Sequence, residues 1–238
     1  MNLDEAIEGL EKLVAEVRSA SLTDDKSRLG SALALRQEAR LINEGVSEFD
    51  VIIFGDLNDF KHLNDLHGHD AGDVAITEVG EAIRKLFVDE LEGKAFRQSG
   101  DEFVILLNQS KLANLLSVAA SFGRIRFSYN RKPLETTISL GYVLNDKKVS
   151  FEELLGRAEI ACQLAKTKGE DGCTEWTDSI KHNPLVRISG ICRKCGARIS
   201  CNVPKQHSPS TLKSCPCCGE TLSLCRGIKF RLTQPRPD

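Results

Sequence analysis

An acidic pair lies between a predicted tight turn and an apolar strand in the middle of the chain. Residues 97–103 read Arg-Gln-Ser-Gly-Asp-Glu-Phe and lead into the apolar run 104–107. This arrangement is typical of a hairpin whose turn lifts carboxylates, here Asp101 and its neighbour, above the edge of a sheet. A second apolar run, residues 51–54, ends just before Asp56. Carboxylates at two strand ends can share divalent cations, and Mg²⁺ prefers a few carboxylates together with substrate phosphates.

These residues are part of a series of motifs that resembles the GGDEF-domain family of diguanylate cyclases. Residues 99–103 are similar to the GGDEF motif, with serine at the first glycine. Residues 56–65 (Asp-Leu-Asn-Asp-Phe-Lys-His-Leu-Asn-Asp) are similar to the family's D-x-D-x-F-K-x-x-N-D segment. The other matching segments are 68–73 (G-H-x-x-G-D), 137–141 (T-x-S-x-G) and 158–166 (an Ala-Glu-Ile-Ala run followed by Ala-Lys). Residues 21–28 resemble in part the family's opening D-x-L-T-x-L-x-N-R. The resemblance covers roughly residues 20–178.

The expected fold is an α/β (α+β) sandwich, because predicted helices and strands alternate along the chain. The sheet is expected to be mainly antiparallel with helices packed on it, and the resemblance implies the nucleotide-cyclase palm with a ferredoxin-like core. Ser21 or Thr23 is expected to cap the first helix of this unit. The predicted strands are 51–55, 95–98, 103–107, 124–129 and 135–143, and the predicted helices are 27–43, 60–66, 72–87, 110–122 and 151–168.

The resemblance implies that Asp56, Asp101 and Glu102 are the catalytic residues. Asp56, Asp101 and the Leu57 carbonyl are expected to bind Mg²⁺ or Mn²⁺, while Glu102 assists in positioning the metal or the hydroxyl. Two metal ions can then activate a 3′-hydroxyl and neutralise departing pyrophosphate. Without the resemblance, an exposed acidic turn and a strand-end helix cap would explain the same residues.

The resemblance also assigns residues to the substrate GTP. Asn64 and Asp73 are expected to read guanine, since a carboxylate can accept hydrogen bonds from both N1–H and the 2-amino group, whereas adenine would leave it unpaired. Structural roles at helix ends are the alternative for this pair, and a solvated helix position is the alternative for each lysine. The expected substrate-binding residues are Asn64, Asp73, Lys61, Lys166, Phe60 and Gly100.

Several positions depart from the family pattern. Ser99 replaces a glycine and is less free at positive φ, but activity is expected to survive. Asn58 replaces a frequent Asp, which is a minor change because the metal ligand is Asp56. Glu170 stands where the family often has a basic residue, and this puts triphosphate affinity and catalytic competence in question. The product-inhibition motif R-x-x-D is replaced at Glu90 and Gly93, so feedback inhibition through that site is not expected.

The C-terminal part of the chain is rich in cysteine. Seven of the nine cysteines follow residue 190, and they include two C-x-x-C-G pairs separated by 19 residues. This spacing predicts a small β zinc ribbon with one structural Zn²⁺, and disulfide or redox chemistry is the alternative. Cys217 could compete as a ligand, and Cys201 and Cys225 are left over. The four expected ligands are Cys192, Cys195, Cys215 and Cys218.

Charge and patterning divide the chain into three predicted units. Residues 181–238 carry 11 basic and 2 acidic side chains, while the preceding residues carry 21 basic and 32 acidic ones. The basic part could meet nucleic-acid phosphates, the acidic body or a partner protein. Apolar residues at heptad spacing predict an N-terminal helix, which pairs with a second copy as a dimer stalk or packs on its own domain. The predicted units are 1–19 (helix), 20–178 (catalytic domain) and 186–233 (zinc ribbon).

Three functions are compatible with these features. The leading hypothesis is a diguanylate cyclase that condenses two GTP into cyclic di-GMP as a homodimer. The first alternative is a catalytically degenerate GTP or cyclic-dinucleotide receptor, which Ser99 and Glu170 would favour. The second is a palm polymerase that makes other oligonucleotides, against which Asp73 and the Asp101-Glu102 pair argue. No signal peptide or membrane span is evident in the sequence, so a cytoplasmic protein without a membrane partner is expected.

Overall fold

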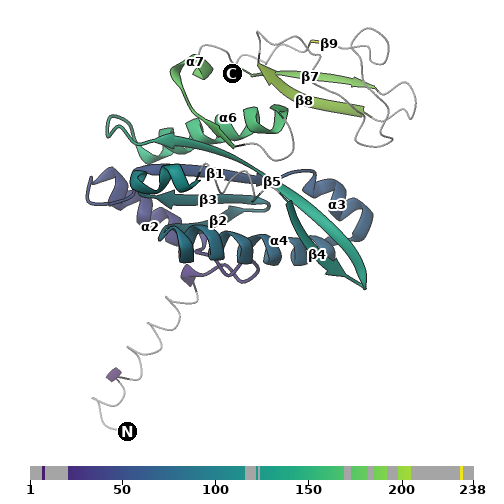
Figure 1. Cartoon of the computed structure of the whole chain (residues 1–238), viewed down its shortest axis with the longest axis horizontal. Coiled ribbons are helices and arrows are strands. Elements are labelled where there is room, and N and C mark those ends of the chain that lie inside the picture. Colours follow the sequence, from purple (N-terminus) through teal and green to yellow (C-terminus); the bar gives the residue numbers. More distant parts are fainter. Residues whose placement is uncertain are drawn as a thin grey trace.

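The computed structural model describes most of the chain between residues 21 and 204. The described residues are 7–8, 21–115, 122, 124–168, 173–181, 185–191, 198–204 and 231–232. Their principal elements, shown in Figure 1, are α2 (Ala32–Asn43), β1 (Val51–Leu57), α3 (Phe60–His67), α4 (His69–Ile83), η1 (Arg84–Glu90), β2 (Lys94–Ser99), β3 (Glu102–Leu107), η2 (Gln109–Lys111), β4 (Arg124–Tyr129), β5 (Lys132–Leu144), α6 (Phe151–Lys168), β6 (Cys173–Glu175), α7 (Asp178–Lys181), β7 (Leu185–Ile191), β8 (Arg198–Pro204) and β9 (Arg231–Leu232).

The main sheet has the order β2-β3-β1-β5-β4, and β6 also pairs with β5. Every pairing is antiparallel except β5 with β6, which is parallel. The prediction of a mainly antiparallel sheet is therefore confirmed. Strands β1 and β3 lie next to each other with Asp56 opposite Glu102. The C-terminal end of β1 therefore lies beside the turn that precedes β3.

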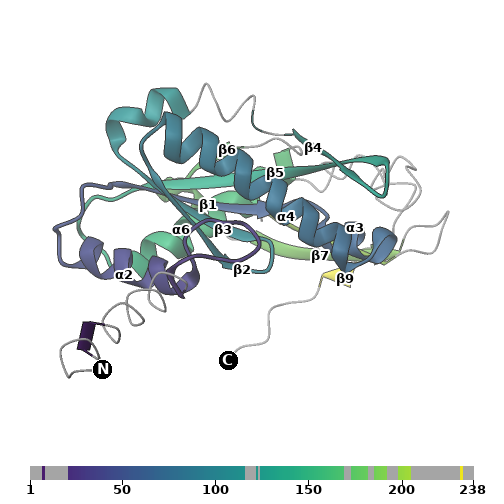
Figure 2. The ribbon, with the colours of Figure 1, turned by 90° about the horizontal axis from the view of Figure 1, so that it is seen from below.

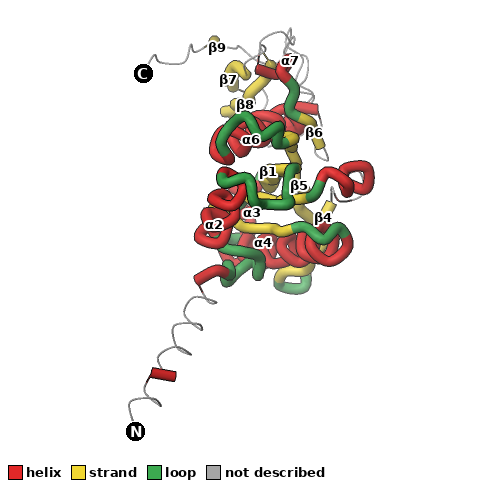
Figure 3. Tube along the Cα trace, turned by 90° about the vertical axis from the view of Figure 1, so that its left-hand side faces the viewer, coloured by secondary structure: helices red, strands yellow, loops and turns green. Residues whose placement is uncertain are grey.

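Both faces of the central strand β1 are buried. On β1, Val51 and Ile53 pack in one hydrophobic cluster with α4, while Ile52 and Phe54 pack in another with α2 and α6. A strand buried on both faces is expected to be continuously apolar, which explains the run at the start of β1. Figure 3 shows the strands between α6 and α4, and Figure 2 shows α4 crossing the sheet.

The first helix of this unit begins later than predicted. The structure starts α2 at Ala32 and caps it with Ser31, whose hydroxyl accepts from the Ala34 amide, so Ser21 and Thr23 are not its caps. Residues 24–29 form a turn instead, in which Arg28 has a φ of 60°, and a helix cannot continue through that conformation. Sequence periodicity missed this turn because its residues are polar and helix-compatible.

The other boundaries shift by a few residues. The helix predicted from residue 72 begins at His69, and its last turns are the π-helical segment η1 rather than α-helix. The strand predicted at 135–143 extends over Lys132–Leu144 because it pairs with β4 in a hairpin whose turn residues, Asn130 and Arg131, have positive φ. Of the helix predicted at 110–122, residues 116–121 lie outside the described part.

A second, three-stranded sheet follows the first, with the order β8-β7-β9. Both of its pairings are antiparallel, and β8 contacts α6. The four predicted zinc ligands and most of the predicted N-terminal helix lie outside the described residues. The division into three units therefore stays a prediction. Among the helices that the structure describes, none is both long and apolar enough to cross a membrane.

Candidate active site

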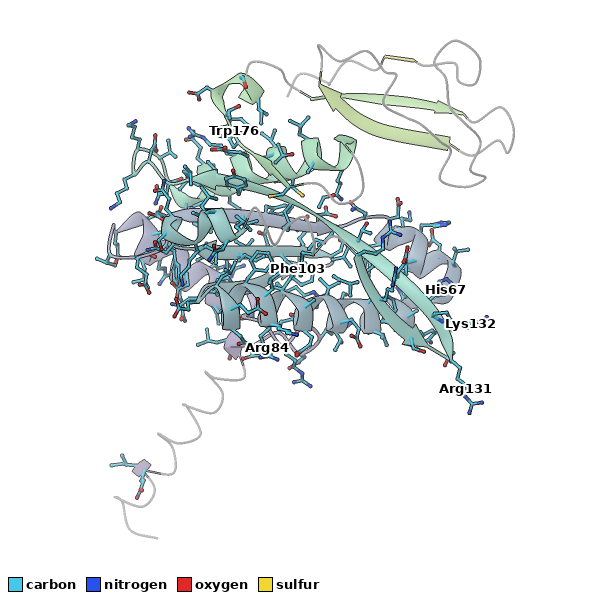
Figure 4. All side chains as sticks on the ribbon, in the orientation of Figure 1. His67, Arg84, Phe103, Arg131, Lys132 and Trp176 are labelled. Carbon is cyan, nitrogen blue, oxygen red and sulfur yellow. The ribbon has the colours of Figure 1, made fainter. Side chains whose placement is uncertain are left out.

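The two strand-end acids predicted from the sequence lie side by side. Asp56 is the sixth residue of β1, and the Leu57 amide donates to the Asp101 carbonyl across 3.2 Å. Burial raises the pKa of the Asp56 carboxyl; the hydrogen bond and charge of Lys166 lower it, and the nearby charges of Asp101 and Glu102 raise it further. The three carboxylates therefore lie close enough for their charges to interact where β1 ends and β3 begins. Figure 4 shows the side chains of this sheet, with Phe103 labelled on the strand that follows the acidic turn.

The donor set at this edge fits a hard divalent cation. Within the described ranges, no three His, Cys, Asp or Glu side chains are grouped as a metal site made by protein alone. Mg²⁺ commonly uses one or two carboxylates and takes its remaining ligands from phosphates and water. Asp56, Asp101 and the Leu57 carbonyl are such a partial set.

The turn that carries Asp101 is held by an arginine. Arg97 donates through Nε and Nη2 to the Gly100 carbonyl at 2.9 and 2.7 Å, and through Nη1 to the Asp24 carboxylate at 3.1 and 3.2 Å. Gly100 has a φ of 43°, a conformation that glycine adopts without a steric penalty. Arg97 therefore connects the turn that carries Asp101 to the turn formed by residues 24–29.

The serine in the first position of the motif is compatible with this hairpin. Ser99 is the last residue of β2 and pairs with Glu102, so the positive φ falls on Gly100 and not on the serine. The Ser99 hydroxyl donates to Glu102 Oε2 at 2.5 Å. Ser99 thus fits the turn without strain and orients one of the predicted catalytic carboxylates.

The residue after Leu57 is fixed by its amide. Asn58 donates through Nδ2 to Thr137 Oγ1 at 2.9 Å and accepts from the Ser139 hydroxyl at 3.0 Å. Its backbone N–H donates to the Thr137 carbonyl at 2.8 Å. An amide serves both side-chain bonds, because it offers a donor and an acceptor. The change from Asp to Asn therefore anchors the end of β1 to β5.

The two lysines that the resemblance assigns to substrate binding lie in different environments. Lys166, on α6, forms an ion pair with Asp56 Oδ1, and both side chains are partly buried. Lys61 is exposed near the start of α3. Glu170 lies outside the described residues. A lysine beside this carboxylate can neutralise either that acid or a bound phosphate, since its ammonium group acts as a point charge.

The predicted base-reading residues come from two successive helices, as expected. Asn64 is on α3 and Asp73 on α4, and Gly68 between them has a φ of 86°. Asn64 Oδ1 is buried and has no hydrogen-bond partner among the residues that the structure describes. It lies against Gly72, where a Cβ atom would overlap this oxygen and come within 3.1 Å of the Phe60 ring.

A buried amide oxygen without a hydrogen-bond partner is costly, so a ligand group that donates to Asn64 Oδ1 would be bound favourably. The N1–H and 2-amino groups of guanine are donors of this kind. Asn64 thus has a chemical reason to face a ligand, and the ring of Phe60, another of the predicted substrate-binding residues, also lies near Gly72. The structure brings Asn64, Phe60 and Gly72 together.

Three charged residues around this site were not assigned roles from the sequence. Arg97 stands directly before the turn, and its position there was the available signal. The pKa of Glu159, on α6, is raised mainly by burial and also by the charge of Glu102. Lys26 forms an ion pair with Asp73, and no sequence pattern predicted that contact.

The product-inhibition motif is absent for a steric reason as well as a chemical one. A Cβ atom at Gly93 would overlap the Leu107 side chain and lie 2.6 and 2.8 Å from the backbone oxygens of Leu106 and Phe87. An acid at this position would therefore require the backbone to move. The expectation of no feedback inhibition through this site stays a prediction, and this geometry supports it.

Comparison with known proteins places this site in a family. Residues 21–172 match the family model described as diguanylate cyclase, GGDEF domain. Diguanylate cyclase A of Treponema denticola is 31% identical over 131 residues, which are 52% of this chain and 34% of that protein. Diguanylate cyclase DgcN of Escherichia coli is 26% identical over 159 residues, which are 64% of this chain and 38% of that protein.

The fold is shared with solved structures. The coiled coil and GGDEF domain of DgcB from Caulobacter crescentus, in complex with c-di-GMP, is similar with a TM-score of 0.62 at 22% identity. The similarity covers 72% of this chain and 94% of that one. The palm fold predicted from the motifs is therefore confirmed. The chain spans little more than a third of the length of the two curated relatives.

Proposed function

Because the chain belongs to the GGDEF-domain family of diguanylate cyclases, we propose that it condenses two GTP into cyclic di-GMP and two pyrophosphates. The observation that carries this proposal is the pairing of Asp56 with the turn of Asp101, fixed by the Leu57–Asp101 backbone hydrogen bond. Asp56, Asp101 and the Leu57 carbonyl would hold Mg²⁺ or Mn²⁺. Such an ion, when bound, polarises the α-phosphate and stabilises the attacking and leaving oxygens.

The remaining residues would bind and orient the substrate. Lys166 and Lys61 would contact the triphosphate, with Lys166 moving from Asp56 to a phosphate oxygen. Asn64 and Asp73 would bind the guanine edge, and Glu102, oriented by Ser99, would position the 3′-hydroxyl or the metal. The hydroxyl of one GTP would attack the α-phosphorus of the other, and its proton would pass to solvent as pyrophosphate leaves.

One site of this kind binds one GTP, so two chains would have to face each other for the reaction. The predicted N-terminal helix or the predicted zinc ribbon would bring the two chains together. Each site would then supply the 3′-hydroxyl that attacks the nucleotide bound by the other. A homodimer is therefore part of the proposal.

The test is a product analysis by mass spectrometry of the purified full chain with GTP, ATP or both, in the presence of Mg²⁺. We expect cyclic di-GMP from GTP alone and no product from ATP alone, because Asp73 would face an acceptor on adenine. The Asp101→Ala variant should make no detectable product. GTP binding by a dimeric, metal-supplied protein without any product would refute the cyclase and favour the receptor alternative.

We further propose that the C-terminal part binds one structural Zn²⁺ through Cys192, Cys195, Cys215 and Cys218. Two observations support it. The spacing of the pairs fits four thiolate ligands. The first pair also falls in the connection between the antiparallel strands β7 and β8, a common place for a metal-binding loop. A basic ribbon of this kind would contact a nucleic acid or a protein partner.

The zinc proposal predicts a metal content. Elemental analysis of the purified protein should find about one zinc per chain, and the double variant Cys192→Ser/Cys215→Ser should lose it. Cys173→Ser is the matched control, because this free thiol lies on β6 in the main sheet. Zinc retained by the double variant, or absent from the wild type, would contradict the proposed ligands.

A further inference from the structure

The turn that precedes α2 runs along one face of α4. The Thr77 hydroxyl donates to the Lys26 carbonyl at 3.1 Å, and Ser27 packs so closely that a Cβ atom at Gly80 would overlap its backbone. Positions 73, 77 and 80 lie on one face of a helix, since neighbours on that face are three or four residues apart. The backbone at residue 26 is therefore fixed beside Asp73.

The Lys26 side chain reaches the carboxylate predicted to read the base. Its Nζ lies 2.5 Å from Asp73 Oδ1, and the two side chains are 47% and 45% exposed. An exposed ion pair of this kind contributes little to stability, and it can exchange with a competing ligand. The turn that carries Lys26 is nevertheless fixed, because Asp24 accepts from the amide and the hydroxyl of Ser27 at 2.8 Å and also pairs with Arg97.

We propose that Lys26 is a specificity-determining residue that competes with the guanine 2-amino group for Asp73. This inference rests on the proposed function, in which Asp73 binds the guanine edge. A free carboxylate offers one oxygen to N1–H and the other to the 2-amino group. When Lys26 is bound to Oδ1, the negative charge of that oxygen also interacts with the ammonium group. The hydrogen bond that the oxygen accepts from the 2-amino group is then weaker. The 2-amino group then contributes less to binding.

An ion pair with only a structural role would not change the discrimination between two bases, whereas this competition should. Hypoxanthine differs from guanine only in missing the 2-amino group, so it measures the hydrogen bond in question. The wild-type protein should discriminate weakly between guanine and hypoxanthine nucleotides. Removal of the Lys26 charge should sharpen that discrimination, while the N1–H contact stays available to both bases.

The experiment compares binding of 3′-deoxy-GTP and 3′-deoxy-ITP to the full chain by titration calorimetry with Mg²⁺ present. These analogues lack the attacking hydroxyl, so they bind without reacting. We expect Lys26→Met to raise the ratio of the two dissociation constants, hypoxanthine over guanine, by about tenfold, the size of one charge-assisted hydrogen bond. Lys26→Arg, which keeps the charge, should leave the ratio within about twofold of the wild type.

Lys111→Met is the matched control, because Lys111 forms an equally short exposed ion pair with Glu92 on another part of the chain. It should not change the ratio. A ratio that stays unchanged in Lys26→Met, although the wild type binds the guanine analogue, would overturn the role of Lys26 and leave the proposed function standing. Failure of the wild type to bind either analogue would overturn both.

Discussion

Asp56→Asn should lower the rate of cyclic di-GMP formation by about 10³-fold, since several kcal/mol of charge stabilisation depend on the metal that this carboxylate is proposed to hold. Asparagine keeps the size of the side chain but cannot supply a negative ligand. In the metal-free site the pKa of Asp56 is raised mainly by burial, so protons should compete with the metal for this carboxylate at a higher pH than they would for an ordinary aspartate. The measurement is the initial rate of product formation across pH.

The same variant should be at least as stable as the wild type. A folded-state pKa above the unfolded one means that ionising Asp56 costs stability, and this cost appears as pH rises through the folded pKa. The neutral amide introduced by the substitution avoids that cost at pH 7. Calorimetry should therefore give a melting temperature that is equal to or above that of the wild type at pH 7. The two values should converge in acid.

Asp89→Asn provides the control for this variant. Asp89 also pairs with a basic side chain, Arg84, but on the exposed surface of η1. Its replacement should leave the rate of cyclic di-GMP formation unchanged. An Asp56→Asn enzyme within about threefold of the wild-type rate would contradict the assignment of Asp56 as a metal ligand.

The part of the site that could be predicted consists of residues next to strong local patterns. Asp56 follows a run that is apolar because both faces of β1 are buried, and Asp101 follows a glycine that a tight turn requires. Each acid is placed by its own strand. Their proximity then follows from the antiparallel pairing of β1 with β3.

The contacts that could not be predicted join residues far apart in the chain through irregular backbone. Lys26 and Asp73 are 47 residues apart, and Arg97 and Asp24 are 73 apart. Both contacts depend on a turn in which Arg28 has a positive φ, a conformation that no local pattern of arginine predicts. The late start of α2 at Ala32 has the same origin. Sequence periodicity therefore does not predict the conformation of irregular turns made of polar residues, or the contacts that such turns make.

Gly141→Ala should destabilise the protein, with a loss of about 2–4 kcal/mol in the free energy of unfolding. Gly141 is the point where β5 meets α6. A Cβ atom there would overlap backbone atoms of Ala158 and Cys162 and lie 2.6 Å from the carbonyl carbon of Ala161. Backbone atoms in a helix cannot rotate away as a flexible side chain can, so α6 would have to move off the sheet.

Movement of α6 would also alter the active site, because Lys166 pairs with Asp56 from this helix. The stability change is measured by urea unfolding, and the midpoint should fall without a large change in slope. Gly156→Ala is a control on the same helix. Apart from its chain neighbours and the backbone of its own helix, no described atom lies within 4 Å of a Cβ at Gly156, and alanine in a helix interior is favoured over glycine by about 0.5–1 kcal/mol.

The two variants should therefore shift the unfolding midpoint in opposite directions, although each adds one methyl group at a glycine. Gly156→Ala tests the propensity of α6 alone, and Gly141→Ala tests its contact with β5. A Gly141→Ala protein as stable as the wild type would show that the helix does not approach the strand so closely. The position of Lys166 over Asp56, which the proposed chemistry requires, would then need another support.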